Sequence, residues 1–165
     1  MKTAEELTRL FRAQGRKVTP QRQCIFRVLQ GDVTHPSADA VYAAARQEME
    51  TISLKTVYQT LNELAAMGEL DALDVGTGTT RFDPNVEVRH HHLVCRSCGK
   101  VRDLHADFGH LQVPADAAAG FEVGEAEVVF RGLCDQCRPA GHDRQRGRRR
   151  AAPSAGVPPP PPTDP

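Results

Sequence analysis

The sequence of 165 residues predicts an α+β protein with two small domains, the first helical and the second rich in strands. Three observations predict this division. Apolar residues recur at helical spacing through residues 4–67, two short strands follow in residues 70–82, and two Cys-X-X-Cys pairs lie in the C-terminal half. Because small domains bury proportionally little surface, a structural metal ion is a usual source of added stability.

Four helices are expected in the first domain, because the apolar stretches begin at good capping residues or end at glycines. Thr19-Pro20 opens the second helix, and Ser53 caps the fourth. The expected helices cover residues 4–14, 19–30, 37–49 and 53–67. A strand over residues 70–75, a turn over 76–78 and a return strand over 79–82 complete a hairpin.

This order of elements is that of a winged helix, and the helix over residues 53–67 is the candidate recognition helix for a DNA major groove. Its apolar side chains form one stripe, and its polar side chains carry donors and acceptors that match base edges. The polar side has the following residues, with the tyrosine on its flank: Lys55, Thr56, Tyr58, Gln59, Thr60 and Glu63. The alternative is a solvated helix face that binds nothing.

The formal net charge of the chain is zero, so bulk charge does not predict a nucleic-acid partner. Residues 1–30, however, carry seven basic side chains against two acidic ones, a local excess that suits phosphate groups. Arg22 lies in this stretch and is expected to contact DNA. A solvated basic surface is the alternative.

The cysteines predict a zinc site. No signal peptide or membrane-spanning apolar run is apparent, so we expect a cytoplasmic protein without a membrane partner. In that reducing compartment, paired Cys-X-X-Cys motifs are metal ligands more often than disulfides. Cys95, Cys98, Cys134 and Cys137 would give a closed tetrahedral zinc site that supports folding, and redox chemistry is the alternative.

A second set of ligands surrounds the first Cys-X-X-Cys pair. His90 and His92 are two residues apart on an expected strand, so both face one side and the histidine between them faces the other. Asp103 follows, and His35 and Asp83 are available from the N-terminal half. Imidazoles and carboxylates together suit Fe(II), Mn(II) or Zn(II) without selecting among them. Surface histidines without a ligand role are the alternative.

With these motifs the sequence resembles the ferric uptake regulator family of bacterial metal-dependent repressors. The resemblance extends from about Val18 to Cys137. It is carried by six segments: VTPQR (18–22), HPSADAVY (35–42), SLKTVYQTLNEL (53–64), TTRFD (79–83), HHHLVCRSCGKVRDLH (90–105) and GLCDQC (132–137).

The resemblance implies a homodimer that binds an inverted-repeat operator in double-stranded DNA. It implies a winged-helix DNA-binding domain in residues 1–83, a hinge in 84–88, and an α/β dimerisation domain with structural zinc in 89–137. Residues 138–165 are rich in arginine and proline, have no counterpart in the family, and are expected to form a disordered tail.

The resemblance also implies a regulatory metal site that joins both domains and holds Fe(2+) or Mn(2+). Its ligands would be His35, Asp83, His90, His92 and Asp103. The iron-responsive branch usually has glutamates at the two carboxylate positions, so the two aspartates resemble the peroxide-responsive branch. There, Fe(II)-catalysed oxidation of a ligand histidine by hydrogen peroxide releases the metal and the DNA. His35 and His90 would be the oxidised residues.

The sequence leaves several alternative functions open. Within the family, the protein could regulate uptake of iron, manganese or zinc instead of sensing peroxide. Outside it, the histidines and aspartates could form the open site of a mononuclear iron enzyme. Against an enzyme, the sequence has no substrate-orienting motif, so none is expected. A zinc-stabilised interaction module without a sensing role is the last alternative.

Overall fold

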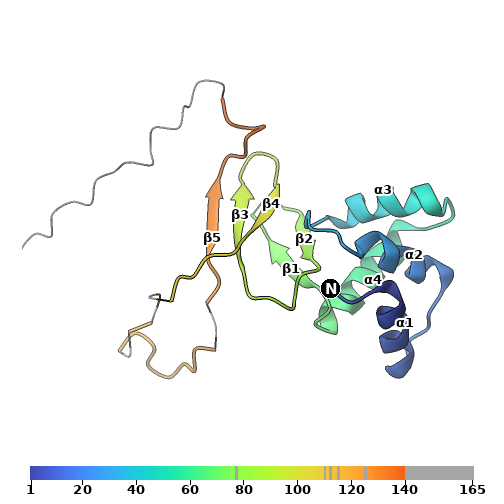
Figure 1. The fold of residues 1–165 in the computed structure, drawn as a ribbon, viewed down its shortest axis with the longest axis horizontal. Coiled ribbons are helices and arrows are strands. Elements are labelled where there is room, and N and C mark those ends of the chain that lie inside the picture. Colours follow the sequence, from blue (N-terminus) through green and yellow to red (C-terminus); the bar gives the residue numbers. More distant parts are fainter. Residues whose placement is uncertain (77, 110, 112, 115, 125, 140–165) are drawn as a thin grey trace, which may run out of the picture.

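The computed structural model describes residues 1–139 except 77, 110, 112, 115 and 125, and in this part of the chain helices precede strands (Figure 1). The helices are α1 (Ala4–Ala13), α2 (Pro20–Leu29), α3 (Ala38–Glu48) and α4 (Leu54–Ala66). The strands are β1 (Asp71–Asp74), β2 (Thr80–Asp83), β3 (His91–Cys95), β4 (Val101–Leu104) and β5 (Val129–Gly132). The predicted α+β class is confirmed. From residue 140 on, the predicted tail lies outside the described residues.

The helices begin at hydroxyl side chains that accept hydrogen bonds from their first turns. Thr19, Ser37 and Ser53 cap α2, α3 and α4, as expected. Helix α1 begins with a capping box that the sequence analysis did not identify, in which Thr3 and Glu6 each bond the backbone of the other. Four of the backbone N–H groups that helices leave unpaired are thus satisfied by their own caps.

One apolar core joins the four helices to strand β2. Its fully buried members include Phe11, Phe26, Leu61 and Leu64 from the helices, and Phe82 from β2 lies among them. Figure 1 shows β1 and β2 between the helices and the remaining strands. The hairpin is therefore anchored to the helical core through β2.

Phe82→Ala is expected to lower the free energy of unfolding by about 3–5 kcal/mol, because it empties a fully packed site. The side chain is 2% exposed, so little of the cavity can fill with solvent. Urea unfolding followed by circular dichroism measures the loss. Phe82→Leu, which keeps most of the volume, should lose less, and equal losses for both variants would contradict the packing explanation.

The C-terminal sheet has the order β4-β3-β5, with β3 antiparallel to β4 and parallel to β5. It buries Val94 and Val101, which form a cluster with Val75 just after β1, and Leu73 of β1 and Val129 of β5 pack against this cluster. Such a small core provides little hydrophobic stabilisation. Among the described residues, no helix is long and apolar enough to cross a lipid bilayer.

Candidate metal centres

The loop before α3 brings His35 to the β1–β2 hairpin. Its backbone has φ 53°, in the left-handed region that residues other than glycine seldom adopt. The carbonyl of Pro36 accepts a 3.0 Å hydrogen bond from the N–H of Phe82, and the next residue forms a β-bridge with β2. Loop and strand are thereby fixed together, which places His35 Nε2 3.5 Å from Asp83 Oδ2.

Strands β3 and β4 provide the other three side chains. Their antiparallel register pairs His92 directly with Asp103, and His90 lies just before β3. The Nε2 atoms of His90 and His92 are 3.1 Å apart, so both face one side, as expected. His91 faces the other side, where its ring centroid lies 4.9 Å from that of Phe108.

The five predicted ligands come together in one cluster. One potential ligand atom from each lies within 4.8 Å of the others, and these side chains belong to His35, Asp83, His90, His92 and Asp103. His35 Nε2–Asp103 Oδ1 and His90 Nε2–Asp83 Oδ2 are both 2.8 Å. Ligand atoms about 2.1 Å from one ion, at angles of about 90° to 110°, lie roughly 3.0–3.4 Å apart. The spacing fits a single divalent ion.

The hydrogen bonding of these atoms also fits a cation. His35 Nε2, Asp83 Oδ2 and Asp103 Oδ1 are buried and have no hydrogen-bond partner, although other polar atoms of the cluster lie close by. Buried polar groups in proteins are rarely left unpaired, because each one costs about 1–3 kcal/mol. Atoms that are close yet badly aligned for mutual hydrogen bonds are arranged like ligands that share one centre.

Asp83 and His92 shift each other's pKa values in the cluster. Burial alone would raise the pKa of Asp83, but contacts with His35 and His92 and the backbone N–H of Asn85 outweigh burial and lower it. The pKa of His92 is raised by Asp83, against the effect of burial, and Glu127 raises it further. Asp83 is therefore held as a carboxylate, the form that binds metal.

An outer layer of hydrogen bonds orients the inner atoms. The backbone N–H of Asn85 donates to Asp83 Oδ1 (2.7 Å), and the Asn85 amide donates to Asp103 Oδ2 (3.4 Å). His90 Nδ1 lies 2.8 Å from the Val88 carbonyl, and His92 Nδ1 lies 2.8 Å from Glu127 Oε1. Each bond leaves the opposite atom, Oδ2, Oδ1 or Nε2, directed into the cluster, as outer partners do in metal sites.

Sequence reasoning missed Asn85 and Glu127. An aspartate that accepts from the N–H two residues later is a common turn, so the Asp83–Asn85 spacing carried a usable signal. Glu127 is 35 residues from His92, and no local sequence pattern indicates that the two are in contact.

The four cysteines form the second cluster. They are all free thiols, and one sulfur from each lies within 4.8 Å of the others. Cys98 Sγ–Cys134 Sγ is 3.7 Å, close to the edge of about 3.8 Å that a tetrahedron with Zn–S bonds of about 2.3 Å requires. A disulfide needs about 2.05 Å. Cys95 ends β3 and Cys134 follows β5, so the parallel pairing of these strands brings the two Cys-X-X-Cys turns together.

The thiols do not share one ionisation behaviour. Backbone N–H groups of Cys134 and Cys98 lower the pKa of Cys95 to about 6. Ser97 lowers the pKa of Cys137, but contacts with Cys98 and Cys134 raise it more, to about 12. A cation between the sulfurs would favour the thiolate form of Cys137 as well, which suits a zinc-type site.

The outer face of α4 carries most of the predicted DNA contacts. Lys55, Tyr58 and Gln59 are exposed and Thr56 is half-buried, with its hydroxyl donating to Gln21. Thr60 differs from the prediction: it is fully buried, because its hydroxyl is satisfied by the Thr56 carbonyl one turn earlier (2.7 Å).

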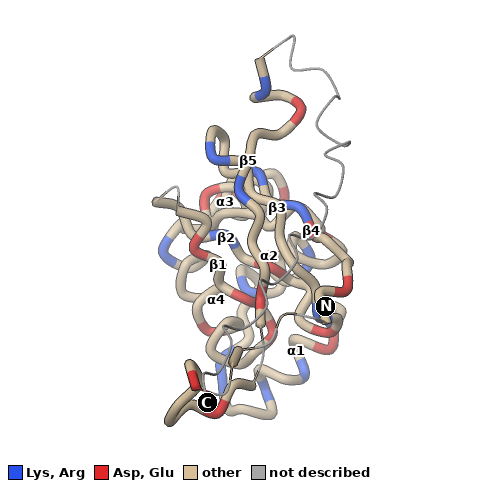
Figure 2. Tube along the Cα trace, turned by 90° about the vertical axis from the view of Figure 1, so that its left-hand side faces the viewer, with Lys and Arg blue, Asp and Glu red and all other residues tan. Residues whose placement is uncertain are grey.

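Arg22 lies behind this face rather than on it. It is 9% exposed, and its guanidinium donates to Glu63 (2.6 Å) and to the Lys17 carbonyl (2.6 Å). Glu63 also pairs with Arg16 and accepts from Gln59. The contacts of Arg16 and Arg22 with Glu63 thus connect the loop before α2 to the polar side of α4. Figure 2 shows basic and acidic residues mixed along the chain, consistent with its zero net charge.

A model of the ferric uptake regulator family matches residues 13–131, which span α2 to α4, the β1–β2 hairpin, the histidine–aspartate cluster and the first Cys-X-X-Cys pair. The chain belongs to the ferric uptake regulator family. The resemblance inferred from sequence motifs is thus confirmed.

Individual relatives of the ferric uptake regulator family extend the comparison. The peroxide-responsive repressor PerR of Staphylococcus epidermidis is 32% identical over 139 residues, which cover 84% of this chain and 92% of that repressor. The crystal structure of the Vibrio cholerae ferric uptake regulator has a TM-score of 0.63 at 29% identity and covers 76% of this chain and 98% of its own. A zinc-bound manganese uptake regulator has a TM-score of 0.63 at 25% identity, covering 81% and 99%.

The ferric uptake regulator family consists of transcriptional regulators rather than enzymes, and its repressors bind DNA operators as dimers. The chain is accordingly a metal-dependent regulator, with one zinc-type cluster of four cysteines and one cluster of histidines and aspartates.

Proposed function

We propose that the protein is a metal-dependent transcriptional repressor that senses hydrogen peroxide through its histidine–aspartate cluster and controls oxidative-stress genes. One observation carries the proposal: both carboxylates that converge on the three histidines are aspartates, Asp83 and Asp103. The 32% identity to a peroxide-responsive repressor supports it.

DNA binding is assigned to the N-terminal half as a winged helix. Residues 1–83 form this domain, residues 84–88 form a hinge, and residues 89–137 form the dimerisation domain of a homodimer. The exposed side of α4, with Lys55, Tyr58 and Gln59, reads an inverted-repeat operator, and Thr56 and Arg22 support that reading surface. The hydrogen bonds of α4 to Gln21 and Arg22 favour a fixed orientation of this helix.

Metal binding would control the relative position of the two halves. The cluster takes His35 and Asp83 from the N-terminal half and His90, His92 and Asp103 from beyond the hinge. Ligands on both sides of a hinge make the free energy of metal binding depend on the hinge angle. Fe(2+) or Mn(2+) then favours the arrangement that binds DNA, since a ligand shifts a population only by its differential affinity.

Peroxide would act on a ligand histidine, His35 or His90. Bound Fe(II) would catalyse cleavage of the peroxide O–O bond and would not be consumed in the overall balance. Overall, one hydrogen peroxide transfers one oxygen atom to a ring carbon and leaves as water, so the imidazole loses two electrons. Asp103 is the ligand side chain most open to solvent, 20% exposed against 1–6% for the other four, which favours access from its side. The shorter aspartate arms also leave more room than glutamates.

The test is mass spectrometry of the full-length protein. We expect that after anaerobic loading with Fe(II) and a slight excess of peroxide, the peptides containing His35 or His90 gain one oxygen and operator binding is lost. Protein loaded with Mn(II) is the control and should remain unmodified.

Unmodified histidines with intact DNA binding would leave regulation of iron or manganese uptake as the function. That alternative has its own support, because the chain is also similar to the Vibrio cholerae ferric uptake regulator and to a manganese uptake regulator.

A further inference from the structure

We propose that Glu127 is a positioning residue of the regulatory cluster that acts through His92. The inference rests on the proposed metal-binding function of that cluster. Glu127 is not one of its five candidate ligands. Glu127 Oε1 lies 2.8 Å from His92 Nδ1, while His92 Nε2 lies 3.5 Å from Asp83 Oδ2. The imidazole thus stands between the glutamate and the cluster.

The backbone around Glu127 is fixed at this place. The N–H of His92 donates to the Val128 carbonyl (3.1 Å), and the N–H of Val128 donates to His91 Nδ1 (3.2 Å). Two residues further on, β5 begins its parallel pairing with β3, with His92 opposite Val129. This also gives His91 a structural role. Its ring holds the segment whose glutamate contacts the neighbouring histidine.

A carboxylate on Nδ1 changes what His92 can do. It accepts a hydrogen bond from Nδ1–H and so favours the tautomer whose lone pair is on Nε2, the atom that faces the cluster. The negative charge also makes the imidazole a stronger donor to a cation, as outer carboxylates do for metal-bound histidines.

The three histidines of the cluster are supported unequally. The outer nitrogen of His90 contacts the neutral Val88 carbonyl, and the outer nitrogen of His35 is buried without a hydrogen-bond partner. His92 alone among these three contacts a carboxylate through its outer nitrogen. We therefore assign it the role of strongest imidazole donor in the cluster.

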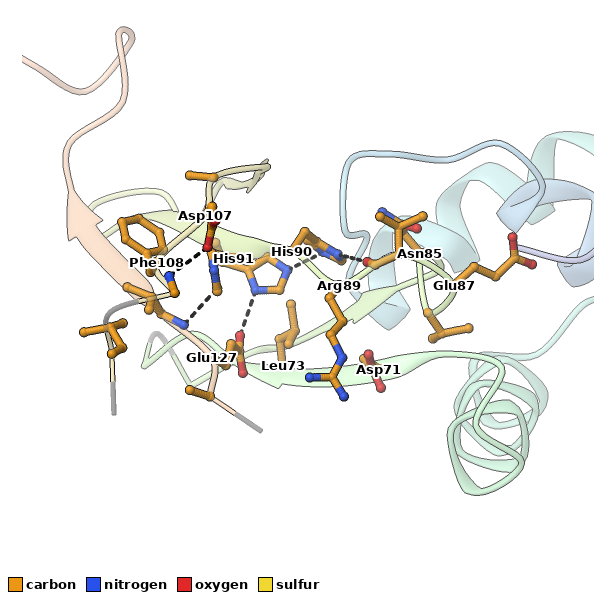
Figure 3. A pocket seen from close by; sticks show the side chains of 18 of the residues that line it. Asp71, Leu73, Asn85, Glu87, Arg89, His90, His91, Asp107, Phe108 and Glu127 are labelled. Atoms are coloured by element: carbon orange, nitrogen blue, oxygen red, sulfur yellow. Dashed lines mark hydrogen bonds and ion pairs between the residues drawn. The ribbon is translucent and has the colours of Figure 1, made fainter. Parts of the chain in front are cut away.

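Glu127 approaches from the solvent side. Its side chain is 49% exposed and lines an open pocket together with His90 and His91, as Figure 3 shows. His92, by contrast, is 5% exposed. Replacing Glu127 therefore removes a surface carboxylate without creating a cavity, and the fold should survive the change.

The test compares Mn(2+) affinity and one proton signal in full-length protein that retains its structural zinc. Glu127→Ala should weaken Mn(2+) binding about 10- to 100-fold, the usual cost of losing an outer partner. The Mn(2+) affinity of Glu127→Gln should lie between those of wild type and Glu127→Ala, because the amide oxygen accepts the same hydrogen bond without the charge. Glu122→Ala removes another exposed acid from the same segment, and its Mn(2+) affinity should equal that of wild type.

The proton signal separates positioning from a general structural effect. In diamagnetic protein with Zn(2+) in both clusters, the Nδ1–H of His92 should give a sharp, exchange-protected NMR resonance. We expect Glu127→Gln to keep it and Glu127→Ala to lose it. Wild-type Mn(2+) affinity together with a protected resonance in Glu127→Ala would overturn the inference.

The variant Asp103→Asn distinguishes an error in the role given to Glu127 from an error in the proposed metal site. If Asp103→Asn weakens Mn(2+) binding and Glu127→Ala does not, only the role of Glu127 is wrong. If neither variant changes the affinity, Mn(2+) binds elsewhere, and the regulatory cluster and the role of Glu127 are both wrong.

Discussion

Cys134→Ser is expected to abolish zinc binding and unfold the C-terminal sheet while the four helices remain folded. This sheet contributes only Val94 and Val101 to its buried cluster of three valines, whereas the helices share a core of fifteen buried residues. Zinc bound by such thiolate sites contributes about 10–16 kcal/mol, as much as the whole stability of a typical domain, about 5–15 kcal/mol. The sheet therefore depends on the metal far more than the helices do.

Three measurements check this result. Zinc content should fall from one ion per chain to none, circular dichroism should retain the helical signal, and limited proteolysis should cut within residues 89–137 first. Cys24→Ala is the matched control, since Cys24 is buried in the helical core and away from the cluster. It should keep its zinc. A folded, zinc-containing Cys134→Ser protein would refute the structural role of this site.

His90→Ala is expected to abolish metal-dependent DNA binding without unfolding the protein. His90 Nε2 contacts Asp83 Oδ2 at 2.8 Å and His92 Nε2 at 3.1 Å, so its removal opens the centre of the cluster. Losing an outer partner alone costs 10- to 100-fold in affinity. Losing an inner ligand should cost more than about 100-fold for Mn(2+).

The readout is fluorescence anisotropy on a DNA duplex selected by the Mn(2+)-loaded wild type from random sequence. Melting temperature and zinc content should stay unchanged. His105→Ala is the control, because the His105 ring lies 5.7 Å from that of His90 and yet offers no ligand to the cluster. Equal losses in both variants would mean that the region, and not the ligand, supports DNA binding.

Much of the fold could be predicted because its signals are local. The caps at Thr19, Ser37 and Ser53 depend on bonds within one helical turn. The same-side placement of His90 and His92 follows from the two-residue period of a strand. The convergence of His35 and Asp83 with the C-terminal ligands was available only through the family resemblance, because backbone pairing between distant segments has no local pattern.

Other features depend on tertiary contacts and could not be predicted. Thr60 has a polar side chain, but the hydrogen bond from its hydroxyl to the Thr56 carbonyl allows it to be buried. The burial of Arg22 depends on Glu63, 41 residues away. Glu127 meets His92 only through the register of β3 and β5. Each of these positions is defined by a partner far along the chain.

Strand β2 joins the helical core to the histidine–aspartate cluster through neighbouring residues. Phe82 is buried among the helices, and Asp83 is buried in the histidine–aspartate cluster. Successive side chains of a strand point to opposite faces, so one peptide unit carries both. A shift of the Asp83 backbone is therefore expected to move Phe82, which lies in a closely packed core with little empty space to absorb the movement. Strand β2 is thus the shortest covalent path between the histidine–aspartate cluster and the helical core, and we expect metal binding to reach the helices through it.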